Sequence, residues 1–310
     1  MAGRAEALLL LLCFALSPSA GAQDTNPYAK FHRPPDIVNS RYGPHTRNVL
    51  DVWKADTLAP APLVVYIHGG GFLSGDKTNL PPALLRQFLD AGIAVASINY
   101  RYTTDAPYPA PMLDGARAVQ YLRENHERYH IDPKRVAAAG GSAGGGISLW
   151  LAYHDDLADP AASDDTAHRS TRLRCAVGVG AQSTYDPVVM ERLVGAVILQ
   201  HPGFEPFCGI KQPDWKTPAA RRCFEDSSPV NHLSADDPPV LLLYDQPDAP
   251  LGTLSLNQAA HHPAFGEFLK EKAAKLRVTV KVVRREDFTG APLPQMYPKI
   301  VSFLREFCGF

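Results

Sequence analysis

The sequence predicts an α/β fold with a mostly parallel central sheet and helices on both faces. Two observations predict it. Runs of Val, Ile, Leu and Ala stop at glycines or polar residues, and segments with helical spacing of apolar residues lie between them. Strands that are apolar along their whole length are buried on both faces, which is typical of parallel sheets with helical crossovers. The chain of 310 residues, 45% of them hydrophobic, can bury such a core.

The elements follow in order along the chain. Residues 47–55 alternate like a half-exposed strand. Buried strands are expected in residues 61–72, 92–102, 135–142, 172–182, 238–248 and 278–283. Helices are expected in residues 111–125, 143–154, 263–277 and 295–307. This alternation predicts a single domain over residues 23–310.

One segment, from about residue 186 to 229, breaks the alternation. It contains Pro, Gly, Cys and aromatic residues and only short helical pieces. An insertion between two strands of such a sheet commonly lies over the strand ends, so we expect a lid or a pocket wall. A surface excursion without a role is the alternative.

The charge balance excludes some classes of partner. Lys and Arg number 31 and Asp and Glu number 32, which leaves a formal net charge of −1. A basic footprint for nucleic acid is missing, so we expect no nucleic-acid partner. The sequence contains no CxxC pattern or His/Cys cluster that would predict a metal site. We expect no cofactor, and the oligomeric state is open.

Residues 1–22 have the pattern of a signal peptide. Arg4 supplies a positive charge, residues 7–16 form an apolar run, and the small residues Ala20 to Ala22 precede the expected mature start at Gln23. The run is short for a bilayer span, so we expect a secreted or periplasmic protein with no membrane span after cleavage. An uncleaved anchor is the alternative.

Four cysteines remain in the predicted mature chain. Cys208 and Cys223 lie in the inserted segment, where a disulfide would staple the chain in an oxidising compartment. The alternative is four free thiols, with Cys175 and Cys308 as the other two.

Ser142 lies in the pattern G-x-S-x-G, formed by residues 140–144, between a predicted strand and a predicted helix. A serine in such a tight turn is pushed above the sheet edge, and small neighbours let the helix fold back close to the strand. The turn also directs the N–H of Ala143 to the same place. We interpret Ser142 as a nucleophile, and a glycine-rich packing turn is the alternative.

A second glycine-rich motif, His68 to Phe72, lies at the end of the predicted strand 61–72. Three successive glycines leave backbone N–H groups unshielded, and such donors can stabilise a developing oxyanion. The alternative is a flexible loop. Two signals in this order along the chain are stronger than either alone.

With these motifs the chain resembles the α/β-hydrolases, in the esterase and lipase group typified by hormone-sensitive lipase and small acetyl- or feruloyl-esterases. The resemblance covers roughly residues 45 to 305 and is carried by residues 68–72, 99–102, 108–122, 140–145 and 228–248. It implies Ser142 as nucleophile, Gly70, Gly71 and Ala143 as oxyanion donors, and Asp248 as the acid. It also implies that His68 supports its loop.

The sequence departs from the family at the general base. The family's histidine follows the last strand, but no histidine occurs after His262 here. His261 and His262 precede the predicted helix after the acid-bearing strand, so one of them, His261 slightly favoured, can serve as the base. A capping or packing role for the pair is the alternative, and His232 and His201 are weaker candidates.

The acid also has a competitor. Asp245 lies three residues before Asp248, and aspartates in such a proline-rich stretch often only form turns. Gln182 and Tyr185 follow a predicted core strand, and we expect them to border the substrate pocket.

The sequence therefore predicts an exported serine carboxylester hydrolase that acts on small acyl or polysaccharide side-chain esters through an acyl-enzyme. A binding protein on the same fold, which has lost its general base, is the alternative. A peptidase is a weaker third interpretation.

Overall fold

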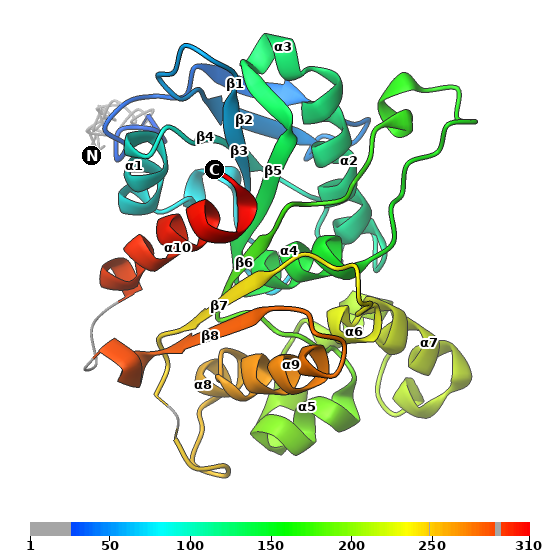
Figure 1. Ribbon diagram of the computed structural model, residues 1–310. Coiled ribbons are helices and arrows are strands. Elements are labelled where there is room, and N and C mark those ends of the chain that lie inside the picture. Colours follow the sequence, from blue (N-terminus) through cyan, green and yellow to red (C-terminus); the bar gives the residue numbers. More distant parts are fainter. Residues whose placement is uncertain (1–25, 248, 289–292) are drawn as a thin grey trace, which may run out of the picture.

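An eight-stranded sheet forms the centre of the protein, with the strand order β1-β2-β4-β3-β5-β6-β7-β8 (Figure 1). The computed structural model describes residues 26–247, 249–288 and 293–310. The strands are β1 (Ile37–Arg41), β2 (Val49–Trp53), β3 (Ala61–Ile67), β4 (Ala94–Ile98), β5 (Ile131–Gly141), β6 (Ala176–Val179), β7 (Val240–Tyr244) and β8 (Val280–Arg284). Only the pairs that include β2 are antiparallel, which confirms the predicted mostly parallel sheet.

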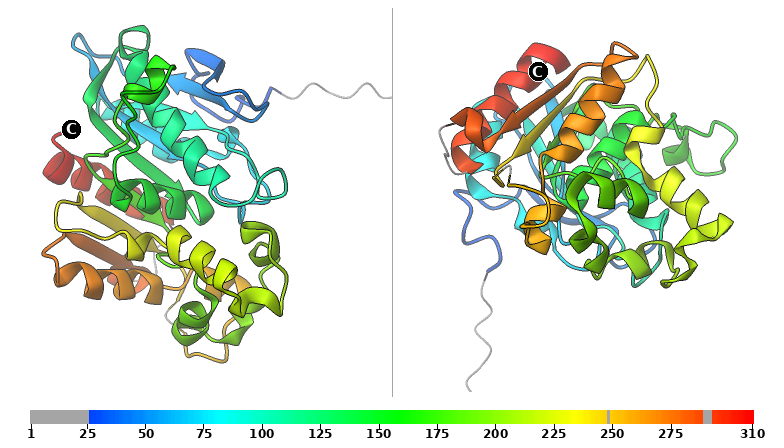
Figure 2. Two further views of the ribbon diagram at one scale, coloured as in Figure 1. Left: turned by 90° about the vertical axis from the view of Figure 1, so that its right-hand side faces the viewer. Right: turned by 90° about the horizontal axis from the view of Figure 1, so that it is seen from below.

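Helices cover both faces of this sheet, as the sequence predicts. On one face α1 (Pro82–Asp90) and α10 (Leu293–Cys308) bury their apolar residues in a common core. The opposite core receives α2 (Ala110–Glu124), α4 (Ala143–Tyr153) and α9 (Ala264–Ala274). Figure 2 shows the two layers from the side and from below. The short helices α3 (His126–Tyr129) and α8 (Leu256–Ala260) complete this part of the fold.

Strand β2 corrects one expectation. Its alternating pattern predicts a half-exposed strand, but four of its five residues are buried, so that prediction is wrong. The polar position, Asp51, is buried because it pairs with Lys77 at 2.8 Å and accepts a hydrogen bond from the Tyr28 hydroxyl. A buried charge is tolerated when it is paired and hydrogen-bonded, and the sequence pattern alone does not distinguish this from exposure.

The predicted insertion lies between β6 and β7. It contains α5 (Pro187–Val194), α6 (Phe204–Cys208), α7 (Pro218–Ser227) and short 3₁₀ turns that include Ala196–Gln200. In Figure 1 these helices gather below the sheet, on the side toward which β5 runs into α4. The insertion therefore lies at the carboxyl edge of the parallel strands.

The four cysteines form two disulfides, so the alternative of four free thiols is wrong. Cys208 and Cys223 join α6 to α7 with a Cα–Cα distance of 6.1 Å, as expected for the insertion. Cys175 and Cys308, 5.8 Å apart at their Cα atoms, tie the start of β6 to the end of α10. The second pair was not predicted, because 133 residues separate its members.

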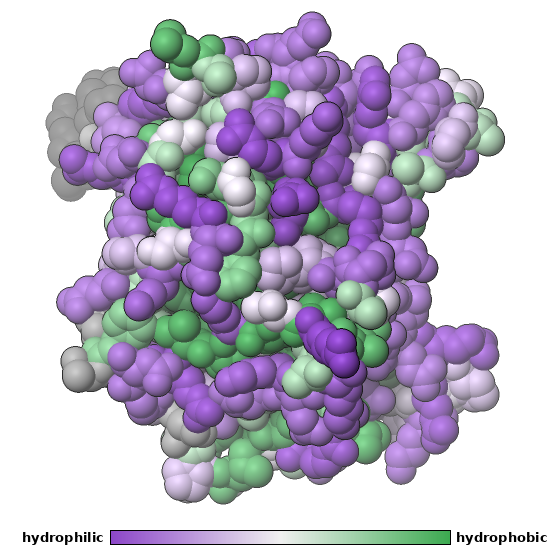
Figure 3. Space-filling view, in the orientation of Figure 1, coloured by the Kyte–Doolittle hydropathy of each residue, from purple (hydrophilic) through white to green (hydrophobic). Residues whose placement is uncertain are grey.

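The surface shown in Figure 3 is mostly hydrophilic, with hydrophobic residues in a band where β7 and β8 run. Of the helices in the described ranges, none is long and apolar enough to cross a membrane. The predicted signal peptide, residues 1–22, lies outside the described residues.

Candidate active site

Ser142 occupies a sharp turn between strand β5 and helix α4. Its backbone has φ 51° and ψ −123°, and its N–H donates to the Val179 carbonyl at 2.8 Å. A positive φ is strained for a residue other than glycine and persists only where the surroundings impose it. The sheet and the helix impose it here, and this is the geometry expected of a nucleophile elbow.

The glycines around Ser142 let the helix approach the sheet. A Cβ atom on Gly144 would lie 2.0 Å from the Ile67 carbonyl oxygen, and one on Gly140 would lie 2.4 Å from the Gly144 carbonyl carbon. Both contacts are to backbone, which cannot move aside. The small residues therefore serve the close packing of α4 against β3 and β5.

The glycine loop lies beside this turn because of the sheet register. Ile67 at the end of β3 pairs with Gly140 of β5, so the loop that follows Ile67 begins next to the elbow. Gly70 has φ +116° and Gly71 has φ +60°. Among the described residues, neither the Gly70 N–H nor the Gly71 N–H donates to a protein acceptor. Ala143 begins α4, where a helix leaves its N–H groups without intrahelical partners.

His68 supports this loop from below. Its buried ring stacks on Tyr100 with a centroid distance of 4.3 Å and donates from Nδ1 to the Gly69 carbonyl at 2.7 Å. Burial lowers the pKa of His68 to about 4, so the ring is neutral. The neutral ring accepts at Nε2 from the Arg47 guanidinium at 3.3 Å. His68 thus fastens the loop to the sheet.

The structure brings His261 to Ser142. His261 Nε2 lies 2.9 Å from Ser142 Oγ, although 119 positions separate them in the chain. The imidazole follows α8 and donates from Nδ1 to the Asn257 carbonyl at 2.9 Å. With Nδ1 protonated, the lone pair of the neutral ring is on Nε2, facing the hydroxyl. Burial lowers the pKa of His261 below its ordinary value, opposed by the Asn257 hydrogen bond and the charge of Asp245.

His262 has a different place from its neighbour. Its ring is buried, and Nδ1 accepts from the Ala264 N–H at 3.1 Å at the start of α9. This contact is of the capping kind. Of the two adjacent histidines, His261 is the one in hydrogen-bond contact with Ser142.

The acid position is only partly described. Asp248 lies outside the described residues, so its role stays a prediction. Asp245 lines a hollow together with Ser142, His261 and Asn257. In the familiar triad a carboxylate accepts the Nδ1–H of the base. Here the Asn257 carbonyl accepts it, and the Asp245 carboxylate acts on His261 through its charge.

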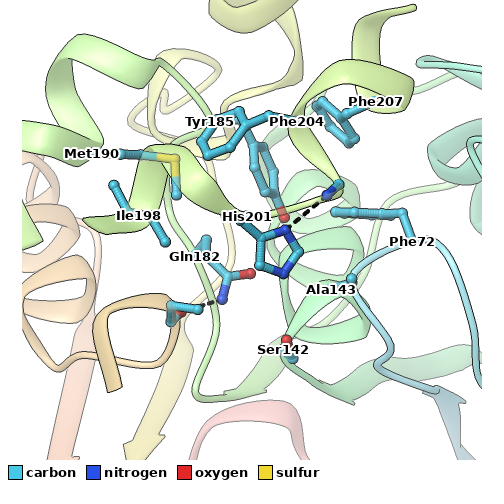
Figure 4. Close-up of a pocket in the computed structure, with 13 residues that line it drawn as sticks. Phe72, Ser142, Ala143, Gln182, Tyr185, Met190, Ile198, His201, Phe204 and Phe207 are labelled. Atoms are coloured by element: carbon cyan, nitrogen blue, oxygen red, sulfur yellow. Dashed lines mark hydrogen bonds between the residues drawn. The ribbon is translucent and has the colours of Figure 1, made fainter. Parts of the chain in front are cut away.

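A cavity of about 50 Å³ opens above Ser142 (Figure 4). Its wall includes Gln182 and Tyr185, the two residues expected there. The Gln182 amide donates to the carbonyls of Gly180 and Ala260, which holds it at the wall. The insertion supplies about half of the lining, namely Met190, Ile198, His201, Gly203, Phe204 and Phe207. The insertion thus forms a wall of the cavity that contains Ser142.

The sheet, the elbow turn and the histidine contact define an α/β-hydrolase. Within that class the chain belongs to the BD-FAE family, whose model matches residues 50–252. Ser142 and the glycine loop fall in the matched segment, and His261 lies beyond its end.

Known proteins agree with this assignment. The chain is 30% identical to a probable carboxylic ester hydrolase, LipM, of Mycobacterium tuberculosis, over 72% of this chain and 49% of LipM. It therefore spans about half the length of the curated relative. Its fold is similar to a truncated carbohydrate esterase from gut microbiota, with a TM-score of 0.70 and 19% identity, covering 88% of this chain and 96% of that one.

A third similar protein is an acetyl ester-xyloside bifunctional hydrolase from Caldicellulosiruptor lactoaceticus. The TM-score is 0.62 at 20% identity, and the match covers 84% of this chain and 89% of the other. At these identities the two structural likenesses support the fold alone.

Proposed function

We propose that this protein is a serine carboxylester hydrolase that works through an acyl-enzyme. The observation that carries the proposal is the 2.9 Å contact between His261 Nε2 and Ser142 Oγ. A serine hydroxyl is a weak nucleophile until a base takes its proton, and this contact supplies the base. The relative LipM, a probable carboxylic ester hydrolase, supports the same class of reaction.

The residues divide the reaction between them. Ser142 Oγ attacks the ester carbonyl carbon while His261 Nε2 takes its proton. The N–H groups of Gly70, Gly71 and Ala143 hold the oxygen that becomes negative. His261 then gives the proton to the departing alcohol. In the second half His261 removes a proton from a water molecule, whose oxygen attacks the acyl carbon. The bond between that carbon and Ser142 Oγ then breaks, the acid leaves, and His261 returns the proton to Ser142 Oγ.

Two groups stabilise the His261 imidazolium that forms in these steps. The Asn257 carbonyl holds the Nδ1–H, and the Asp245 charge favours the protonated ring. A charge-assisted hydrogen bond of this kind orients the ring and stabilises its cationic form. Asp248 remains our proposal for the acid of the site.

The two spaces next to Ser142 suggest the substrate. The cavity is lined largely by apolar and aromatic side chains, and its volume of about 50 Å³ is far below the roughly 300–1,000 Å³ of sites for drug-sized ligands. A short acyl group fits such a space. A second hollow beside Ser142 is lined by Asp245, Gln246 and Asn257, which suit a polar alcohol portion. We therefore propose short acyl esters of polar alcohols, including ester side groups of polysaccharides.

Two proteins of similar fold, a carbohydrate esterase and an acetyl ester-xyloside bifunctional hydrolase, are consistent with this class of substrate. We also propose export through the segment 1–22, because disulfides such as Cys175–Cys308 persist in oxidising compartments.

The test compares the wild-type protein with Ser142→Ala on p-nitrophenyl acetate and butyrate. We expect the variant to lose on the order of 10⁴-fold or more of kcat. Equal rates for the two proteins would remove the enzyme proposal for these esters and would leave the binding protein as the better interpretation.

A further inference from the structure

His201 is a second histidine in the cavity that contains Ser142. It follows the 3₁₀ turn Ala196–Gln200 of the insertion and lies directly over the glycine loop. A Cβ atom placed on Gly71 would be 2.9 Å from His201 Cε1 and 3.3 Å from Nε2. The ring edge that carries Nε2 is therefore next to a proposed oxyanion donor.

The insertion holds this ring firmly. The Gly203 N–H donates to His201 Nδ1 at 3.1 Å. A Cβ atom on Gly203 would lie 2.9 Å from the Gly71 carbonyl oxygen, so residues 201–203 rest on the loop itself. The ring position thus follows from the contact between the insertion and the glycine loop.

The hydrogen bond from Gly203 determines the tautomer. An N–H group can only donate, so Nδ1 must carry the lone pair, and the proton of the neutral ring is on Nε2. Burial lowers the pKa of His201, and the nearby His261 lowers it further. The ring is therefore neutral at neutral pH, and Nε2 presents one N–H donor.

This donor faces the reacting groups. Figure 4 shows one ring nitrogen bonded toward the insertion and the other turned to the side where Ser142 and Ala143 lie. Gln182 and Phe72 flank the ring in the same view. An N–H in this position points into the space where the ester carbonyl must lie if Ser142 attacks it.

We propose that His201 donates from Nε2 to the carbonyl oxygen of the ester and to the oxyanion that it becomes. His201 is then a side-chain member of the oxyanion hole beside the N–H groups of Gly70, Gly71 and Ala143. This inference rests on the proposed function. It also means that the hole is complete only when the insertion is docked on the loop.

The same geometry excludes His201 as the general base. Its Nε2 carries a proton, and its Nδ1 lone pair is occupied by the Gly203 N–H. His261 has the opposite arrangement, with the lone pair on the nitrogen that faces Ser142. The two imidazoles therefore have complementary roles, one accepting a proton and one donating a hydrogen bond.

Two substitutions separate the donor role from a structural role. His201→Gln places an amide N–H donor at about the reach of Nε2 but removes the acceptor at Nδ1. His201→Asn keeps an acceptor near the position of Nδ1 for Gly203 but has no donor at the reach of Nε2. The two variants differ in the group that each retains, so they make opposite predictions.

We expect His201→Asn to lower kcat on p-nitrophenyl acetate by on the order of 10²-fold with little change in KM, because the lost donor acts mainly in the transition state. We expect His201→Gln to stay within about tenfold of the wild-type kcat. Wild-type kcat in His201→Asn, or an equal loss in both variants, would overturn the proposal.

Ser142→Ala is measured in the same experiment. If wild-type turnover depends on Ser142 and His201→Asn retains it, only the His201 inference fails. If turnover does not depend on Ser142, the proposed function fails first.

Discussion

His261 donates from Nδ1 to the backbone carbonyl of Asn257, four positions earlier in the chain, at 2.9 Å. A backbone carbonyl in the first turn of α8 thus holds the ring where hydrolases with a triad use a carboxylate. The interaction is local to the short helix α8 and the residue after it, so this hydrogen bond does not involve the loop after the last strand. This explains how the proposed base can lie before α9.

The first prediction concerns the identity of the base. His261→Asn keeps a donor for the Asn257 carbonyl but removes the nitrogen that contacts Ser142, so we expect kcat to fall by on the order of 10⁴-fold or more. His262→Asn keeps an acceptor for the Ala264 N–H and is the matched control, with kcat close to wild type. Steady-state kinetics on p-nitrophenyl acetate measures both. Full turnover in His261→Asn would assign the base elsewhere.

The second prediction concerns pH. His261 accepts a proton only when neutral, and its pKa lies below the ordinary 6.5. We expect kcat/KM to rise with pH to a plateau, with a midpoint below 6.5. The charge of Asp245 raises this pKa, so Asp245→Asn moves the midpoint to lower pH. Asp287→Asn, at an exposed position, is the control and leaves it unchanged. A midpoint that moves upward in Asp245→Asn would contradict the assignment.

The third prediction concerns acyl length. Met190 of α5 is 3% exposed and lines the cavity, and Val188 on the same helix is 74% exposed. We expect wild-type kcat/KM to fall along p-nitrophenyl esters from acetate to octanoate. Met190→Ala enlarges the cavity, and each methylene newly buried contributes about 0.8 kcal/mol, or about fourfold in relative kcat/KM. Val188→Ala is the control, and we expect it to keep the wild-type dependence of kcat/KM on acyl length. If kcat/KM depends on acyl length in the same way in Met190→Ala and in the wild type, the acyl group lies outside this cavity.

The fourth prediction concerns the elbow. Gly144→Ala forces a Cβ atom against the Ile67 carbonyl, so we expect a loss of unfolding free energy of about 3 kcal/mol or more. Gly141→Ala is the control, because its Cβ atom would meet only the Val179 carbonyl oxygen at 3.9 Å, an ordinary contact. Thermal and denaturant unfolding compare the two. Equal stability of both variants would show that α4 can move away from the sheet.

The sheet and the nucleophile turn were predictable because their signals are local. Apolar runs predicted the strands, and Gly144 marks a helix that must approach β3 closely. Two strands are exceptions: β1, Ile37–Arg41, was not predicted at all, and β2 was predicted to be half-exposed. In β2 the polar residue Asp51 is buried. Its burial depends on Lys77 and Tyr28, which come from other parts of the chain.

The partners of Ser142 were less predictable. The sequence narrowed the base to two adjacent histidines, but only the bond between Asn257 and His261 directs one ring to the hydroxyl. His201 was a weak candidate for the base. Its place over Gly71 depends on how the insertion packs on the glycine loop, for which the sequence contains no local signal.

The order of apolar and glycine-rich segments in the chain was therefore enough to predict a mostly parallel α/β sheet and to single out Ser142, because apolar runs and tight turns are local patterns. The resemblance of these motifs to the α/β-hydrolases added the family. The assignment of roles to His261 and His201 required the folded chain. An imidazole acts through the direction of its two nitrogens, and contacts made after folding, with the Asn257 carbonyl and the Gly203 N–H, set that direction.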